Sequence, residues 1–170
     1  ELGTKNFSVF LDFVSQESQL THNNIYNIID ALTPLYKSCN PTASADVLNV
    51  FAYVLSELLE NMAKYSIPSK KGTTISFIDY DQSFELSSKN VCDSKQAEAF
   101  KYHLGLMEDK KLSDLFFVKI GEENLNTSQI GLIMILKDYN AKLFVEFDKN
   151  KDNTHIVSLR TILPKMDLAA

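Results

Sequence analysis

Apolar residues recur along this chain with two different spacings, and the change from one to the other predicts the order of helices and strands. Spacings of three and four residues are typical of amphipathic helices. The predicted helices are residues 21–36, about 44–67, 94–106 and 128–139. Stretches rich in β-branched and aromatic residues that partly alternate with polar ones predict strands. The predicted strands are residues 6–14, 73–80, 83–90, 141–148 and 155–163.

Turn residues and prolines set the breaks between these elements. Asp81-Gln82 separates the second and third strands, which predicts a hairpin. Pro34 lies inside the first helical pattern, so we expect it to kink or shorten that helix, whose N-cap is expected at Thr21. Between residues 106 and 128 we expect a short helical segment at 112–118 and a polar loop at 121–127.

This order of elements predicts an α+β fold: a two-layer arrangement with helices on one face of a mixed, largely antiparallel sheet. A chain of 170 residues can bury a sizeable core, and no repeat or low-complexity linker divides it. We therefore predict one domain over residues 1–170. Because the chain begins with Glu1 rather than Met, we expect the natural protein to start earlier.

Charge and composition argue against several classes of function. A net charge of −5 supplies no basic stripe, so no nucleic-acid partner is expected. No apolar run approaches the ~20 residues of a membrane span. Cys39 and Cys92 form neither a disulfide framework nor a CxxC pattern, so we expect reduced thiols in a cytoplasmic protein.

Other familiar catalytic patterns are missing from the sequence. His22, His103 and His155 share no metal-ligand spacing, and no serine lies in a Gly-x-Ser-x-Gly elbow. Glycines stand only at positions 3, 72, 105, 121 and 131, so the chain contains no Gly-x-Gly. This excludes the glycine-rich loops of P-loop, dinucleotide-binding and protein-kinase folds.

The strongest candidate for chemistry lies in the second predicted helix. Glu57 and Asn61 are offset by about 40° around the helix axis and point the same way. Beside them runs an apolar stripe that faces a core, made of Val47, Leu48, Phe51, Leu55, Leu58, Leu59 and Met62. An amide oxygen can ligate Mg²⁺, and a carboxylate can orient or deprotonate a nucleophile. The pair suits a metal–phosphate site, although an ordinary surface helix also carries Glu and Asn at this spacing.

The same stretch resembles the N box of the histidine-kinase-like ATPases, which reads Glu-x-x-x-Asn-Ala-x-Lys-His. Here the matching residues are Glu57, Asn61, Met62, Lys64 and Tyr65. The order of predicted elements resembles that family as well, so the resemblance covers most of the chain. Within the family the chain is most similar to the SiaB-type kinases, which are related to the anti-sigma-factor serine kinases.

The resemblance implies an ATP- and Mg²⁺-dependent protein serine/threonine kinase of a bacterial partner-switching pathway. Its implied substrate is a STAS-like anti-sigma-factor antagonist. Glu57 would be the general base or the residue that orients the acceptor hydroxyl, and Asn61 would ligate Mg²⁺ through ATP. Lys64 would approach a phosphate. Gly131 would supply backbone N–H donors at a helix N-terminus.

Departures from the family pattern keep a second hypothesis open. One glycine of the last nucleotide motif is lost to Ile133, or to Gln129 in the alternative alignment. The Asp-x-Gly-x-Gly box has no counterpart. In the family the Asp of that box recognises the adenine amino group. Asn90 and Asp93 occupy its place and are candidates to contact adenine, but we expect both to serve a structural turn.

The alternative to a kinase is therefore a degenerate, non-catalytic interaction module or a nucleotide sensor. In the charged stretch 107–127, Lys110 and Lys111 remain candidates to contact a triphosphate. The oligomeric state is open too: the strand near residues 7–14 would either complete the sheet or pair with a second subunit.

Overall fold

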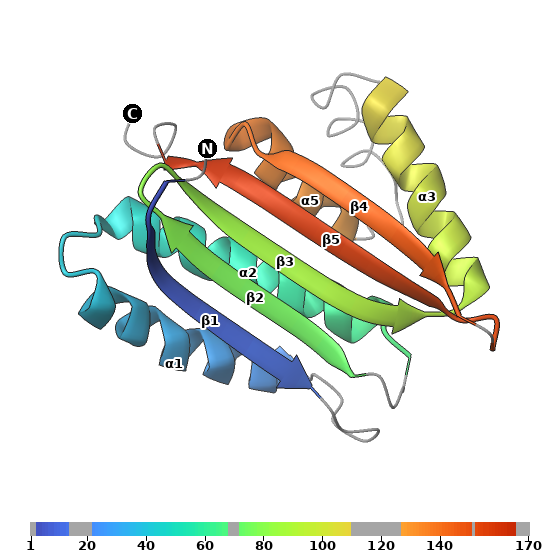
Figure 1. Ribbon diagram of the computed structural model, residues 1–170, viewed down its shortest axis with the longest axis horizontal. Coiled ribbons are helices and arrows are strands. Elements are labelled where there is room, and N and C mark those ends of the chain that lie inside the picture. Colours follow the sequence, from blue (N-terminus) through green and yellow to red (C-terminus); the bar gives the residue numbers. More distant parts are fainter. Residues whose placement is uncertain (1–2, 14–21, 68–71, 110–126, 151, 166–170) are drawn as a thin grey trace.

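Five strands form one open sheet in the computed structural model, which describes residues 3–13, 22–67, 72–109, 127–150 and 152–165. The strands are β1 (Lys5–Phe13), β2 (Thr73–Tyr80), β3 (Ser83–Cys92), β4 (Lys142–Lys149) and β5 (His155–Pro164). Their order across the sheet is β1-β2-β3-β5-β4 (Figure 1), and every neighbouring pair is antiparallel.

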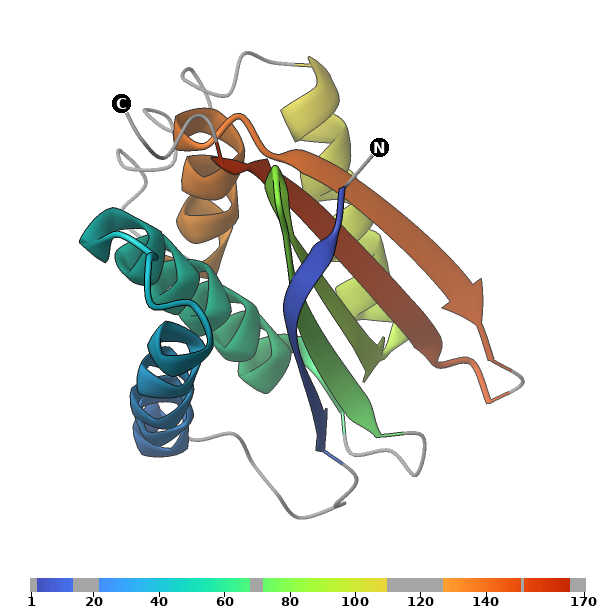
Figure 2. The same cartoon turned by 60° about the vertical axis from the view of Figure 1, so that its left-hand side comes forward.

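The described helices lie on one side of this sheet, as Figures 1 and 2 show together. They are α1 (His22–Cys39), α2 (Ala45–Tyr65), α3 (Ser94–Asp109) and α5 (Thr127–Asp138). The strand register explains why one face is covered. Alternate residues point inward, and the cross-strand pairs Phe77–Leu86 and Leu86–Thr161 place inward positions of three strands side by side. The predicted α+β fold, with helices on one face of a largely antiparallel sheet, is confirmed.

An aromatic cluster fills the core between the sheet and the first two helices. Tyr36 of α1 stacks on Phe51 of α2 at a ring-centroid distance of 4.8 Å. Phe51 in turn meets Phe77 of β2 edge-on at 4.6 Å, and Phe77 lies 5.4 Å from Phe84 of β3. All four side chains are almost completely buried. Edge-on and offset arrangements of this kind are the favourable ones for aromatic rings.

Local capping fixes the ends of α2. The Ser44 side chain accepts a hydrogen bond from the backbone N–H of Val47 at 3.2 Å, which satisfies one of the unpaired donors of the first turn. After Tyr65 the backbone leaves the helix, and the N–H of Ile67 bonds to the carbonyl of Val91 on β3 at 2.8 Å. The end of α2 is therefore tied directly to the sheet, close to the predicted helix end.

Pro34 does not shorten α1, which continues to Cys39. That part of the prediction is wrong. Pro34 is exposed, and so is Asp30, whose carbonyl loses its helical N–H partner to the proline ring. Water can satisfy that carbonyl, and the buried side chain of Tyr36 holds the last turns of the helix against the core.

The other predicted elements are found within three residues of the expected bounds. The hairpin between β2 and β3 turns across Asp81-Gln82 as predicted. The turn between β4 and β5 includes Asn153 at φ 61°, a left-handed conformation that asparagine tolerates better than most residues. Four predictions lie outside the described residues: the N-cap at Thr21, the helix at 112–118, most of the loop at 121–127, and the roles of Lys110 and Lys111.

Candidate functional site

Three of the four predicted site residues share one face of α2. Seen down the helix axis, Glu57, Asn61 and Lys64 fall within about 60° of one another. Glu57 and Asn61 are half-buried, whereas Lys64 is exposed in the last turn, with its ammonium 5.5 Å from the centre of the Tyr65 ring. None of the hydrogen bonds of the described residues involves the Asn61 carboxamide, which leaves its oxygen available to a ligand.

The environment of Glu57 changes its acidity. Burial raises the pKa of its carboxyl from the ordinary value of 4.5 to about 7, and the negative charge of Glu60 adds to the shift. A carboxyl with a pKa near neutrality exchanges protons readily at pH 7, which is the property a general base needs. A surface glutamate with ordinary acidity would hold almost no protons there.

Helix α5 borders this face of α2. The hydroxyl of Tyr53, one turn before Glu57, lies 3.6 Å from the sulfur of Met134 on α5. Burial raises the pKa of Tyr53 well above its usual range, and the charge of Glu57 is the next largest cause. Tyr53 therefore stays protonated, in contact with α5 and close enough to Glu57 for the two groups to interact. Tyr53 was not predicted as a site residue, although its four-residue spacing from Glu57 is visible in the sequence.

Gly131, the fourth predicted residue, lies on α5 but not at its first position. The helix begins at Thr127, which places Gly131 in the second turn. In a regular helix only the first four N–H groups lack a partner within the helix, so the unpaired donors belong to residues before Gly131. The assignment of Gly131 as a phosphate contact stays a prediction.

Asp93 caps helix α3. Its carboxylate accepts a hydrogen bond from the N–H of Gln96 at 2.7 Å, and the Gln96 side chain accepts one from the N–H of Asp93 at 3.0 Å. This reciprocal pair is a capping box. Asn90, the other candidate at this place, is buried and reaches the carbonyl of Tyr65 at 3.5 Å. Both side chains make contacts that hold secondary structure together.

Replacing Asp93 with alanine is expected to lower the free energy of unfolding by about 1 kcal/mol, because the first turn of α3 loses its cap. Urea denaturation of the two proteins measures the difference. Lys95→Ala is the matched control, since Lys95 is exposed in the same turn. An unchanged stability together with a loss of nucleotide affinity would contradict the capping role and favour adenine recognition.

A serine and a histidine meet where α3 begins, but their geometry does not suit nucleophilic catalysis. Ser94 Oγ lies 3.3 Å from His155 Nε2 and 2.9 Å from the carbonyl oxygen of Asn153. A hydroxyl has a single proton, and here the carbonyl accepts it. His155 therefore donates to Ser94 rather than activating it, and the pair fastens the β4–β5 turn to α3.

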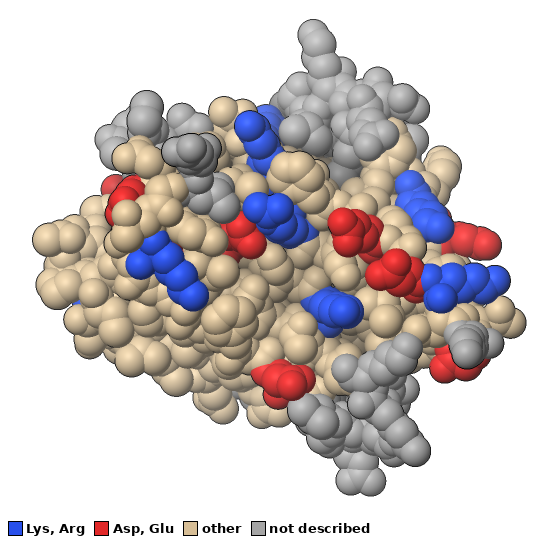
Figure 3. Space-filling view, in the orientation of Figure 1, with Lys and Arg blue, Asp and Glu red and all other residues tan. Residues whose placement is uncertain are grey.

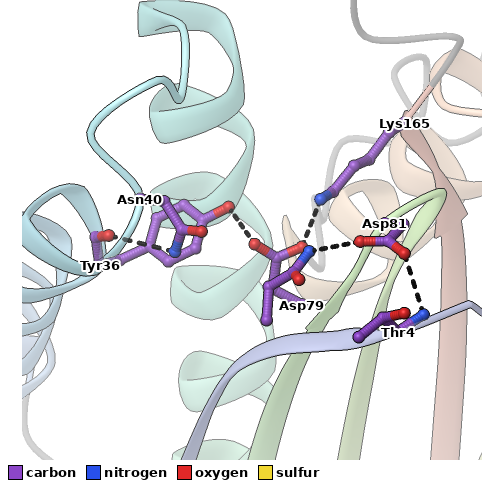
Figure 4. Close-up of polar contacts among 7 residues, drawn as sticks. Thr4, Tyr36, Asn40, Asp79, Asp81 and Lys165 are labelled. Atoms are coloured by element: carbon purple, nitrogen blue, oxygen red, sulfur yellow. Dashed lines mark hydrogen bonds and ion pairs between the residues drawn. The ribbon is translucent and has the colours of Figure 1, made fainter.

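The most deeply buried charge of the described chain is Asp79, with 1% of its surface exposed. Figure 4 shows its carboxylate between the Tyr36 hydroxyl, which donates at 2.9 Å, and the ammonium of Lys165. Burial and the charge of Asp79 raise the pKa of Tyr36 far above its usual range, so the phenol remains a donor. Nearby, exposed Asp81 accepts hydrogen bonds from Thr4 and Asn6, which lower its pKa.

The Asp79 cluster was not predicted from the sequence. Its signal was present, since Asp79 continues the inward alternation of Ile75 and Phe77 along β2. The cluster joins α1, β2 and the end of β5, and it lies at the hairpin end of the sheet. We assign it a structural role.

The described segments contain neither a cluster of metal-binding side chains nor a helix that could cross a membrane. Groups of three or more His, Cys, Asp or Glu side chains that could hold a metal ion are not found there. Among the helices of those segments, none has both the length and the apolar character that crossing a bilayer requires.

Comparison with known proteins gave a match in structure only. No protein-family profile and no curated protein sequence matches this chain. Its fold superposes on a chain of the crystal structure of the SiaB–SiaC complex from Pseudomonas aeruginosa with a TM-score of 0.66. The two chains share a fold. The match covers 91% of this chain and 89% of that chain at 15% sequence identity.

Proposed function

We propose that this chain is an ATP- and Mg²⁺-dependent protein serine/threonine kinase that acts on a SiaC-like partner. The observation that carries the proposal is the half-buried Glu57, with a pKa of about 7, one turn before the available carboxamide of Asn61. The partner class is taken from the structural neighbour, which was crystallised as a SiaB–SiaC complex. We expect the partner to be a STAS-like anti-sigma-factor antagonist in a bacterial partner-switching pathway.

The side chains on this face of α2 fit a magnesium–phosphate group in their chemistry. Asn61 offers a neutral oxygen, Lys64 a positive charge and Glu57 a carboxylate. Bound ATP and Mg²⁺ would supply the phosphoryl group and neutralise charge in its transfer, a reaction that depends mostly on positioning. Glu57 would accept the proton of the serine or threonine hydroxyl on the partner, and Lys64 would approach a phosphate.

Titration with ATP and Mg²⁺, followed by calorimetry, tests the nucleotide site. Wild-type protein is expected to bind with a dissociation constant in the micromolar range, and Asn61→Ala is expected to weaken binding by more than about 100-fold, roughly 3 kcal/mol. The reason is that alanine removes the amide oxygen from the proposed site. Asn49→Ala provides the matched control, because Asn49 is exposed near the start of the same helix. Equal affinities in Asn61→Ala and wild type would refute the assignment of Asn61.

A second candidate function is a non-catalytic interaction module with the same fold. It is favoured by the capping box of Asp93, because a side chain that caps α3 is engaged in structure and not free to recognise adenine. The lack of any Gly-x-Gly also favours it. No binding at millimolar ATP, combined with binding of a SiaC-like protein, would establish this alternative. Binding of ATP without transfer to that protein would instead indicate a nucleotide sensor.

A further inference from the structure

Strand β1 leaves one edge of the sheet open. It pairs with β2 on one side, and in the described part of the chain no strand lies on its other side. Every second residue of an edge strand directs its N–H and C=O away from the sheet, where another strand can bond to them. The strand is nine residues long, enough to pair with a further strand.

The two edges of the sheet differ in charge. Four of the eight residues of β4 are charged, namely Lys142, Glu146, Asp148 and Lys149. Charges spread along an edge discourage pairing with another strand. On β1 the charges are confined to Lys5 and Asp12, near opposite ends, and the residues between them are uncharged. Figure 3, which views the uncovered face of the sheet, shows charged side chains spread more thinly over the β1 side than over the β4 side.

The apolar side chains of β1 are incompletely covered. Phe7, Val9 and Leu11 point to the helix side of the sheet, opposite inward residues of β2, yet all three are only half-buried. On the other face Phe10 is 67% exposed, and the Lys5 ammonium lies 5.7 Å from the centre of its ring. Apolar surface on both faces of an unpaired edge would gain burial from a neighbouring strand.

A bulge near the start of β1 places its two charges symmetrically. Lys5 pairs with Tyr80 and Phe7 pairs with Asp79, so Asn6 is an extra residue. Val9 pairs with Phe77 of β2, Lys5 with Tyr80 and Asp12 with Thr74. Measured along β2, Lys5 and Asp12 therefore lie three residues from Val9 in opposite directions. Both lie on the uncovered face, since Tyr80 and Thr74, their partners on β2, point outward.

We propose that two copies of this chain pair through β1, antiparallel and with the two-fold axis at Val9, to form one continuous sheet. This register sets Lys5 of each copy opposite Asp12 of the other, which gives two ion pairs of opposite charge. Val9 meets its own counterpart, and Phe7 meets Leu11 of the second copy on the helix side. Inward positions face inward positions throughout, as pairing in a sheet requires. A two-fold axis produces such self-complementary contacts.

Charge reversal tests this register through the dimer dissociation constant, measured by analytical ultracentrifugation. Lys5→Asp or Asp12→Lys alone creates two like-charge pairs, so each is expected to raise the dissociation constant by about 10-fold or more. The double variant Lys5→Asp/Asp12→Lys restores both ion pairs, and its constant is expected to return to within about threefold of the wild-type value. Both residues are exposed, and thermal melting of each variant verifies that it is folded.

Cysteine cross-linking provides an independent readout. In the proposed dimer the two Val9 Cα atoms are about 4.5–5.5 Å apart, within the range that a disulfide spans. Val9→Cys in a Cys39→Ser background is therefore expected to form a covalent dimer on mild oxidation. Ser8→Cys is the control, because Ser8 faces Phe10 of the second copy and lies about 8 Å from its own counterpart.

Three results would overturn the proposal. One is a wild-type protein that remains monomeric at high concentration. The proposal fails in the same way if β1 of the monomer binds a strand of a different protein instead of a second copy. Another is a dimer that single charge reversals do not weaken. The last is a dimer in which the double variant fails to recover and Val9→Cys does not cross-link.

Discussion

Replacing Asp79 with alanine is expected to lower the free energy of unfolding by about 3 kcal/mol. The substitution leaves the Tyr36 hydroxyl buried without an acceptor, and an unpaired buried donor costs about 1–3 kcal/mol by itself. It also removes the partner of the Lys165 ammonium. Lys165 retains some exposure and can turn toward water, which keeps the loss at the lower end of the range for a broken buried ion pair. Urea denaturation at pH 7 measures the difference.

The control for Asp79 stands two residues further along the chain. Asp81 also accepts hydrogen bonds, but it is exposed, so Asp81→Ala is expected to be much less destabilising than Asp79→Ala. Asp79→Asn keeps an acceptor for Tyr36 while removing the charge, and should fall between the two alanine variants. If Asp79→Ala were no more destabilising than Asp81→Ala, the cluster would not be holding α1 and β5 to the hairpin.

Replacing Glu57 with glutamine is expected to lower the rate of phosphoryl transfer to the partner by about 10²–10⁴-fold, because the amide cannot accept the proton of the acceptor hydroxyl. This prediction rests on the proposed kinase function. The affinity for ATP should stay close to that of wild type, since glutamine keeps the shape of the side chain. A single-turnover assay with radiolabelled ATP and a SiaC-like protein measures the rate.

The pH dependence separates a catalytic base from a structural carboxyl. Glu57 has to lose its proton to act as a base, so the wild-type rate is expected to rise with pH through about 7. A rate that is independent of pH between 6 and 8, or an undiminished rate in Glu57→Gln, would refute the role of Glu57. Glu60→Gln is a suitable second variant, because the charge of Glu60 contributes to the raised pKa and its removal should move the profile to lower pH.

Stability should change with pH in the opposite direction. Between pH 4.5 and about 7 the folded protein holds a proton on Glu57 that the unfolded chain has released. The free energy of unfolding therefore falls as pH rises through this window. The Glu57→Gln variant has no carboxyl to ionise there, so its stability should not show this fall. At pH 8 the Glu57→Gln protein is expected to be more stable than wild type by about 1 kcal/mol, a reduced value because the carboxylate is only half-buried.

The candidate site was predictable from the sequence in part. The four-residue spacing of Glu57 and Asn61 on an amphipathic helix placed both on one face of α2 without any tertiary information. The acidity of Glu57 was not predictable, because it depends on how much water the packed structure removes. For Gly131 the sequence predicted a helix N-terminus, whereas the structure places it in the second turn of α5.

By itself the sequence determined the elements and their order, because short-range physics controls them. The periods of apolar residues and the Asp81-Gln82 hairpin both act within a few residues. Only the tertiary structure decided which elements meet. It put β5 beside β3, kept α1 intact beyond Pro34, and buried Asp79 against Tyr36, 43 residues away in sequence. Such contacts depend on the free energy of packing the whole chain, which no local pattern records.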